Sequence, residues 1–210
     1  VLSGKRWQRR RLPFPDVVYD RIQARSWERR PETIRAKEML RNSPHTAYFN
    51  EGFFDKWTVH EKMMKHEVLA EFLPPTEKVT DAESLRNFLT KYPSAFLKPT
   101  EGSQGKGIVR IRKHGQRYSW RRGGRVVRHK NLDSLYRYVR RLQRGKTYII
   151  QPDLRLATFG GRPFDVRILW QRDGAGRWRR TKTYARVAAR GQLTSNLSRG
   201  GDGIGLAWAL

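Results

Sequence analysis

The sequence contains no cysteine, and histidine is scarce, with 5 among the 210 residues. Without cysteine the chain has no disulfide framework and no thiolate metal centre. No histidine stands four residues from another, so the HExxH pattern of zinc proteases is absent as well. A histidine-based metal site is therefore not expected.

Long apolar runs and a targeting segment are also missing. No run approaches the roughly 20 residues that a membrane-spanning helix needs. No signal peptide opens the chain. We therefore expect no membrane span and a cytoplasmic protein.

Acidic residues are few compared with basic ones. The chain has 45 Lys and Arg against 19 Asp and Glu, which gives a formal net charge of +26. Such a charge attracts polyanions such as nucleotides and nucleic acids, although a solvated basic surface without a dedicated partner explains it equally. The hydrophobic content of 37% is enough to fill a core, which argues against wholesale disorder.

Turn residues and apolar periodicity predict alternating helices and strands. A polar cap at Asp55 and the Pro74-Pro75 pair bound the clearest helix, and a capping box from Thr80 to Glu83 begins another. The apolar stripe of the first helix is interpreted as a core face, formed by Trp57, Met64, Val68, Leu69 and Phe72. Helices are expected over 32–40, 55–73, 80–92 and 131–143. Strands are expected over 16–22, 94–99, 107–113, 147–154, 163–171 and 182–190, with a hairpin over 118–129.

The order of these elements indicates an α+β fold with a mostly antiparallel sheet rather than a series of βαβ units. Within it, the stretch "FLKPTEGSQGKGIVRI" (96–111) places a lysine and three glycines between two strands. A P-loop and a dinucleotide fingerprint both open a helix and have different glycine spacings, so both are excluded. What remains is a glycine-rich hairpin tip. Its backbone N–H groups and Lys98 could hold phosphate oxygens, or it is an ordinary turn beside a surface lysine.

Several segments together resemble one family. They are "LPFPDVVYDRI", "FNEGFFDKW", "FLKPTEGSQGKGI", "YIIQPDL", "GRPFDVRIL", "ARVAA" and "SNLSRGG", in the same order and over roughly residues 11–201. The strand–loop–strand resembles the phosphate lid of ATP-grasp proteins, and the set as a whole is similar to the YheC/YheD family of endospore coat-associated proteins. The resemblance implies an ATP-grasp fold, in which two α+β subdomains with antiparallel sheets grip ATP.

The resemblance also implies roles for individual residues. Lys56 and Lys98 match the two nucleotide-contacting lysines, and the residues around 150 match the hinge whose backbone reads the adenine edge. The implied nucleotide-binding set is Lys56, Lys98, Gly102, Ser103, Gly105, Gly107, Ile150, Gln151, Pro152 and Asp165. By itself, Lys56 is better explained as a solvent-facing lysine in the first turn of a helix.

The implied catalytic residues are Arg167, Arg186 and Asn196, with Arg199 a looser candidate. Asp165 and Arg167 lie two apart on one strand face, so they could also form a structural ion pair with each other. The implied chemistry is ATP-dependent phosphorylation of a carboxylate to an acylphosphate, which an amine then attacks. Positioning and charge neutralisation would do most of this work.

The family binds Mg²⁺ through late acidic and amide residues that this chain does not supply, so we expect those ligands downstream and no metal ligand here. We therefore expect a fragment truncated at both ends, with an incomplete C-terminal subdomain. Such a fragment is expected to bind nucleotide weakly and to catalyse nothing by itself. The expected division is a linker and the last strand of a preceding domain (1–50), the lid subdomain (51–147) and the start of the catalytic subdomain (148–210).

Three functions stay open. The first is an ATP-grasp protein like ATP-dependent carboxylate-amine ligases, associated with the endospore coat. The second is a catalytically inactive, basic structural component of the coat, and the third is a nucleic-acid-binding protein. The expected partners are ATP, an unknown carboxylate and amine, and spore coat components. Nucleic acid is the least favoured, because its segment "RYSWRRGGRVVRHK" also fits a solvated hairpin.

Overall fold

The computed structural model describes residues 2–3, 6–8, 11–192, 194–195, 197 and 200–210. The chain divides into two compact units, residues 1–54 and 55–210. In the described part, no helix is both long and apolar enough to cross a bilayer.

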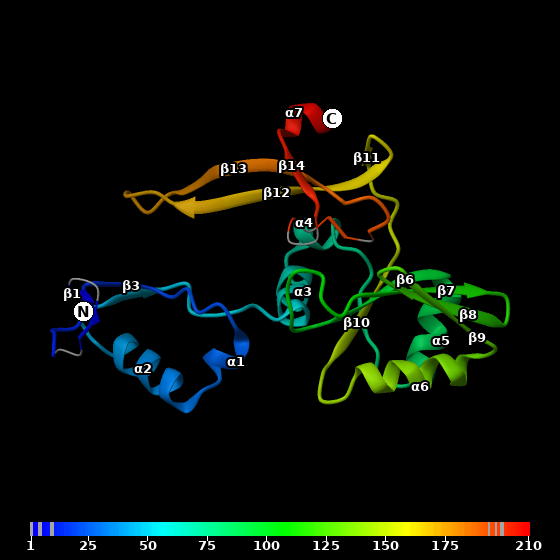
Figure 1. Cartoon of the computed structure of the whole chain (residues 1–210), viewed down its shortest axis with the longest axis horizontal. Coiled ribbons are helices and arrows are strands. Elements are labelled where there is room, and N and C mark those ends of the chain that lie inside the picture. Colours follow the sequence, from blue (N-terminus) through cyan, green and yellow to red (C-terminus); the bar gives the residue numbers. More distant parts are fainter. Residues whose placement is uncertain (1, 4–5, 9–10, 193, 196, 198–199) are drawn as a thin grey trace. The chain divides into compact units, whose positions relative to one another are not determined.

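The first unit is small. It pairs β1 (Leu2–Ser3) with β2 (Arg6–Trp7) antiparallel, and β3 (Val17–Tyr19) with β4 (Ala47–Phe49) parallel. Its helices are α1 (Arg25–Glu28) and α2 (Pro31–Arg41), labelled in Figure 1. The strand and the helix expected over 16–22 and 32–40 are thus confirmed as β3 and α2.

A buried carboxylate organises the first unit. Asp20 accepts hydrogen bonds from Tyr48 Oη at 2.7 Å and from the Ile22 amide at 3.0 Å. Lys37 Nζ lies 2.7 Å from the same carboxylate. Burial raises the pKa of Asp20, but these partners outweigh it and keep the pKa below its ordinary value. Burial and the Asp20 charge raise the pKa of Tyr48 to about 12.

The second unit contains a six-stranded sheet in which every neighbouring pair is antiparallel. The strand order is β5-β10-β6-β7-β8-β9. The strands are β5 (Glu77–Lys78), β6 (Ser94–Pro99), β7 (Val109–His114), β8 (Arg117–Arg122), β9 (Arg125–His129) and β10 (Tyr148–Pro152).

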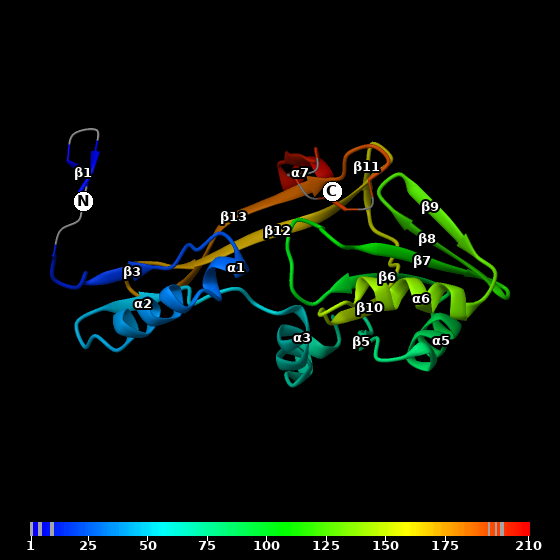
Figure 2. The same ribbon diagram turned by 60° about the horizontal axis from the view of Figure 1, so that its bottom comes forward.

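Two helices cover one face of this sheet, α5 (Ala82–Lys91) and α6 (Leu132–Leu142), as Figures 1 and 2 show. Their buried residues pack against alternate residues of the strands. In β6, Ala95 and Leu97 face this core, whereas Phe96 and Lys98 alternate with them and lie on the open face. The sheet therefore has one face buried by helices and one free of them.

The caps of these helices differ in part from the expectation. Asn131 caps α6 by accepting from the Ser134 amide at 3.0 Å. In α5 the capping box joins Asp81 and Ser84 rather than Thr80 and Glu83, and the Asp81 carboxylate accepts from the Ser84 amide at 2.7 Å. In return, the Ser84 hydroxyl accepts a hydrogen bond from the Asp81 amide. The capping box therefore does not need the Glu or Gln of the usual pattern.

A second, four-stranded sheet has the order β11-β12-β13-β14. Its strands are β11 (Thr158–Phe159), β12 (Arg162–Arg172), β13 (Trp178–Val187) and β14 (Asp202–Ile204), followed by α7 (Leu206–Ala209). Phe164, Ala185 and Val187 form its small core. The antiparallel sheets of the second unit confirm the predicted α+β class, although the long pair β12–β13 lies in a sheet of its own.

The helix expected over 55–73 is wrong in extent and in packing. It divides into α3 (Lys56–Met64) and α4 (Glu67–Ala70), because the backbone is extended at His66, with φ −106 and ψ 110. The break removes the continuous apolar stripe: Val68 is 61% exposed and Phe72 is 79% exposed. No residue of α3 or α4 is buried, so these apolar side chains do not form a core face.

Candidate functional site

A cleft of about 280 Å³ lies on the open face of the six-stranded sheet, opposite the face that α5 and α6 cover. Residues of β6 and β10 form one wall, and residues of β12 with the loop after β13 form another. The lining residues are Pro74, Phe96, Lys98, Ile108, Gln151, Pro152, Leu154, Leu156, Pro163, Asp165, Thr194 and Ser195. The cleft is therefore mostly apolar, with a few polar groups that converge on it.

Lys98 is the cation of this cleft. Its Nζ donates to Gln151 Oε1 at 2.7 Å and lies 5.6 Å from the centre of the Phe96 ring. Gln151 Nε2 in turn donates to Thr76 Oγ1 at 2.8 Å, which fixes the orientation of the amide. Burial lowers the pKa of Lys98, and the charge of Lys56 lowers it further. No carboxylate in the described part of the chain pairs with Lys98, so its charge is balanced only by neutral dipoles.

Lys56 holds the start of the glycine loop. Its Nζ donates to the carbonyl oxygens of Pro99, Thr100 and Gly102 at 3.0, 3.3 and 2.9 Å. Its backbone amide donates to Thr100 O at 3.0 Å. Asp55 caps the helix that begins at Lys56 and accepts from two amides, at 2.9 and 3.1 Å. Lys56 is thus bound to the loop's backbone.

The glycine loop needs glycine at specific positions. Gly107 has φ +80, and a Cβ there would lie 3.1 Å from Pro99 Cγ. Gly102 has φ +131 at the other end of the loop. Side chains are strained at both values. The loop therefore returns tightly against the end of β6 before β7 begins.

Asp165 stands at the other side of the cleft. Arg186 donates to it from Nε at 2.7 Å and from Nη2 at 2.8 Å, and Ser195 Oγ donates at 2.5 Å. Burial raises the pKa of Asp165, but these hydrogen bonds outweigh it and keep the pKa below its ordinary value. The partner of Asp165 is not Arg167, because the β12–β13 register places Arg186 directly opposite.

A cluster of hydrogen bonds around Asp153 fixes the end of β10. Asp153 accepts from Ser94 Oγ and from Arg110 Nε, both at 2.7 Å, and Arg110 Nη2 forms a second bond to the same oxygen. Sequence reasoning assigned no role to Asp153, Arg110, Thr76 and Ser195. Three of them stand in quoted stretches, Asp153 in "YIIQPDL", Arg110 in "FLKPTEGSQGKGIVRI" and Ser195 in "SNLSRGG", whereas Thr76 had no such signal.

The predicted site residues are only partly brought together. Lys98, Gln151, Pro152 and Asp165 line the cleft, whereas Ile150 is 1% exposed and belongs to the core. The loop residues Gly102, Ser103, Gly105 and Gly107 lie beside the cleft, and their neighbour Ile108 lines it. Arg186 reaches the cleft through Asp165, while Arg167 is exposed and outside the lining. Asn196 and Arg199 lie outside the described residues.

Comparison with known proteins decides the family. Residues 45–210 match the family described as "YheC/D like ATP-grasp". The chain belongs to this ATP-grasp family. The predicted resemblance is confirmed, and with it the ATP-grasp fold.

Two curated relatives of this ATP-grasp chain are proteins of Bacillus subtilis (strain 168). Endospore coat-associated protein YheD is 27% identical over 207 residues, which cover 93% of this chain and 44% of the relative. Endospore coat-associated protein YheC is 27% identical over 210 residues, which cover 96% of this chain and 56% of the relative. The chain spans about half the length of the curated relatives it matches.

The ATP-grasp family generally uses Mg²⁺ with ATP, which needs a cluster of oxygen ligands. Among them, no three His, Asp or Glu side chains gather as metal ligands. The carboxylate of the cleft, Asp165, already accepts from Arg186 and Ser195. The donors in the described part of the chain do not make a magnesium site, and we derive no step through the metal.

Proposed function

We propose that this ATP-grasp chain binds ATP in the cleft between β6, β10 and β12. The observation that supports this most is Lys98, a desolvated cation whose hydrogen bond, within the described residues, goes to a neutral amide. A phosphate oxygen would give it the opposite charge that it lacks, and a hydrogen bond to a charged group contributes about 1.5–3 kcal/mol.

The remaining lining suits the other parts of the nucleotide. Phe96, Ile108, Leu154 and Leu156 offer apolar surface for a purine ring. The glycine loop offers backbone N–H groups to phosphates, and Lys56 holds its first residues in place. We retain Gly102, Ser103, Gly105 and Gly107 as the proposed phosphate lid. The division into lid and catalytic subdomains at residue 148 stays a prediction. Strand β10, which would begin the catalytic subdomain, pairs within the six-stranded sheet.

The finer proposal is a carboxylate-amine ligase. A carboxylate oxygen would attack the γ-phosphorus of ATP and release ADP, and an amine would then attack the acylphosphate and release phosphate. Arg186, fixed by Asp165, would orient the anionic groups, and this positioning is the chain's main contribution. Arg167 and Asn196 stay proposed without a described contact to the cleft.

The names of the relatives support a link of this chain to the endospore coat. A catalytically inactive coat component is the second candidate. Measuring ADP release across panels of carboxylates and amines separates the two, because an inactive component binds ATP and releases no ADP with any pair.

The binding proposal is tested by thermal unfolding with and without ATP. At 100 times its Kd, a ligand adds about 2.7 kcal/mol to the free energy of unfolding. We expect this gain in the wild type and its loss in Lys98→Met, which keeps the aliphatic stem and removes the charge. Lys106→Met is the matched control, because Lys106 is exposed in the same loop and outside the cleft lining.

Either of two results would sink the proposal. One is the absence of any ATP-dependent gain in the wild type. The other is a gain of equal size in Lys98→Met and Lys106→Met, which would place the nucleotide elsewhere.

A further inference from the structure

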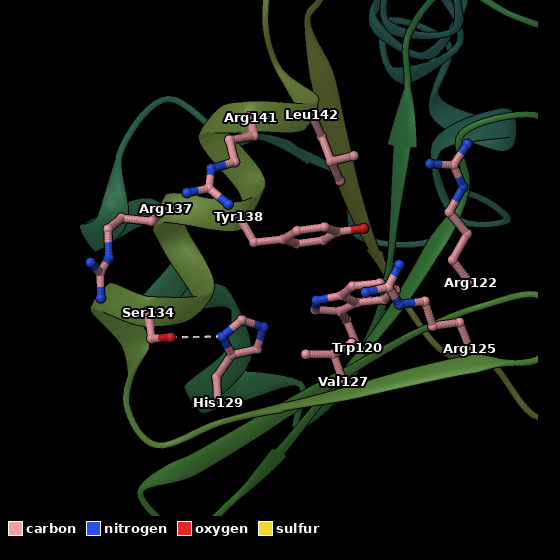
Figure 3. A pocket seen from close by; sticks show the side chains of 10 residues that line it. All are labelled: Trp120, Arg122, Arg125, Val127, His129, Ser134, Arg137, Tyr138, Arg141 and Leu142. Carbon is pink, nitrogen blue, oxygen red and sulfur yellow. Dashed lines mark hydrogen bonds between the residues drawn. The ribbon is translucent and has the colours of Figure 1, made fainter.

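A second cleft, of about 550 Å³, lies between the β8–β9 hairpin and α6 (Figure 3). Its lining residues are Trp120, Arg122, Arg125, Val127, His129, Ser134, Arg137, Tyr138, Arg141 and Leu142. Nothing in the proposed nucleotide site uses it.

Four arginines surround this cleft. Arg122 and Arg125 come from the hairpin, and Arg137 and Arg141 come from the helix, so cations stand on two walls (Figure 3). In the described part of the chain, none of the four has a carboxylate within 4.0 Å, and other side chains form the ion pairs. The sequence from 117 to 146 contains one acidic residue, Asp133. The cleft is therefore a concave concentration of positive charge.

The floor of the cleft is rigid and neutral. The rings of Trp120 and Tyr138 stack at 4.3 Å with an interplanar angle of 7°. His129 Nδ1 lies 2.8 Å from Ser134 Oγ, and burial lowers the pKa of His129. Trp120 Nε1 and His129 Nε2 are buried without a hydrogen-bond partner. The charge of the cleft thus comes from the arginines alone.

Shape and burial limit the class of ligand. A volume of about 550 Å³ is that of a small-molecule pocket rather than a flat track for a duplex. Trp120 is only 6% exposed, and Tyr138 stacks on its face, so no free ring offers a base a stacking platform. Arginine binds phosphate and carboxylate groups bidentately. A compact anion with several such groups would contact both walls at once.

We propose that this arginine cleft binds a compact polyvalent oxyanion, a small molecule that carries at least two phosphate or carboxylate groups. The cleft is independent of the proposed ATP site. Trp120 belongs to the core on the helix-covered face of the sheet, whereas Lys98 lies on the open face. A failure of either proposal leaves the other in place.

Titration calorimetry with inorganic tripolyphosphate tests the proposal. The variant Arg137→Ala/Arg141→Ala removes two cleft cations. The control Arg140→Ala/Arg144→Ala removes two cations from the same stretch that do not line the cleft. We expect the cleft variant to bind at least about tenfold more weakly than the wild type, because two charge-assisted contacts are lost. The control is expected to stay within about twofold, and thermal unfolding confirms that both variants fold.

Two further measurements identify the chemical class of the ligand and the site where it binds. Citrate supplies the carboxylate source, and whichever of citrate and tripolyphosphate binds more tightly assigns the oxyanion chemistry. Lys98→Met removes the cation of the proposed nucleotide site, which tripolyphosphate would also contact, and the loss caused by Arg137→Ala/Arg141→Ala is expected to persist in that background. The proposal is overturned if the wild type binds neither anion, if both double variants lose affinity equally, or if the loss caused by Arg137→Ala/Arg141→Ala disappears in the Lys98→Met background. A DNA duplex that binds more tightly than either small anion, with equal loss in both double variants, also overturns it.

Discussion

On one face of the six-stranded sheet a single lysine, Lys98, is partly buried and bonded to an amide. On the other face four exposed arginines line a larger cleft, and no carboxylate among the described residues is bonded to them. Desolvation makes the lysine costly to leave charged, so a ligand there must supply an opposite charge at one place. The arginines keep their hydration, and their attraction adds up across several charges and is screened by salt. One face is therefore suited to a specific contact, and the other to polyvalent charge.

The largest expected effect comes from a substitution in the core that supports the six-stranded sheet. Leu135 of α6 is 0% exposed and packs in the core beneath the strands. We expect Leu135→Ala to lower the free energy of unfolding by about 3 kcal/mol, through lost burial and a cavity. Urea unfolding measures this. Val126→Ala, at an exposed site of the same sheet, is expected to change it by less than about 0.5 kcal/mol. Equal losses in the two variants would contradict the assigned core.

The second-largest effect distinguishes ligand binding on the two faces of the six-stranded sheet. Lys56→Met removes the bonds from Nζ to three carbonyl groups at the start of the loop. We expect a loss of about 2 kcal/mol in stability, weaker ATP binding and unchanged tripolyphosphate binding at the arginine cleft. Calorimetry with each ligand and urea unfolding give the three readings. Lys62→Met, on the exposed side of α3, serves as the control, and a loss of the same size there would remove the special role of Lys56.

A pH experiment sharpens the role of burial. The pKa of Lys98 in the folded chain lies below the 10.5 of the free side chain, because burial and then Lys56 disfavour its charge. Between these two pKa values the unfolded chain binds more protons, so Lys98 makes the folded state more stable as the pH rises. The stability difference between wild type and Lys98→Met should therefore shift in favour of the wild type from neutral pH to above 10.5. A difference that stays constant would contradict the desolvation of Lys98.

The smallest expected effect checks that the faces act separately. Arg137→Ala/Arg141→Ala should leave the stabilisation by ATP within about 0.5 kcal/mol of the wild-type value. The thermal shift at one ATP concentration measures it. A larger loss would show that the nucleotide uses the arginine cleft.

Local signals predicted much of the sheet. The strand expected over 94–99 is β6, and the hairpin turning at Gly123-Gly124 is β8–β9. These predictions rest on alternation and turn residues, which depend on neighbours in the chain. Lys98 and Gln151 were also placed in the same site, where the structure bonds them to each other.

Partners from distant segments were beyond such signals. Asp165 and Arg167 are close in sequence, but the β12–β13 register gives Asp165 to Arg186. The stripe that includes Val68 and Phe72 has helical spacing, yet spacing does not say that another element will cover it. The arginine cleft was hidden for the same reason, because its cations belong to a hairpin and a helix that only the fold brings together.

The hydrogen bonds at Asp153 have a consequence for proteolysis. Asp153 is held by Ser94 and Arg110, and β11 begins at Thr158. The residues between them, 154–157, are exposed and lie outside any strand or helix. Trypsin cleaves after arginine, and Arg155 stands within this short connection. One cut there would break the backbone connection between the two sheets that line the cleft. The lifetime of this peptide bond in a tryptic digest therefore reports how firmly a bound ligand holds the two sheets together.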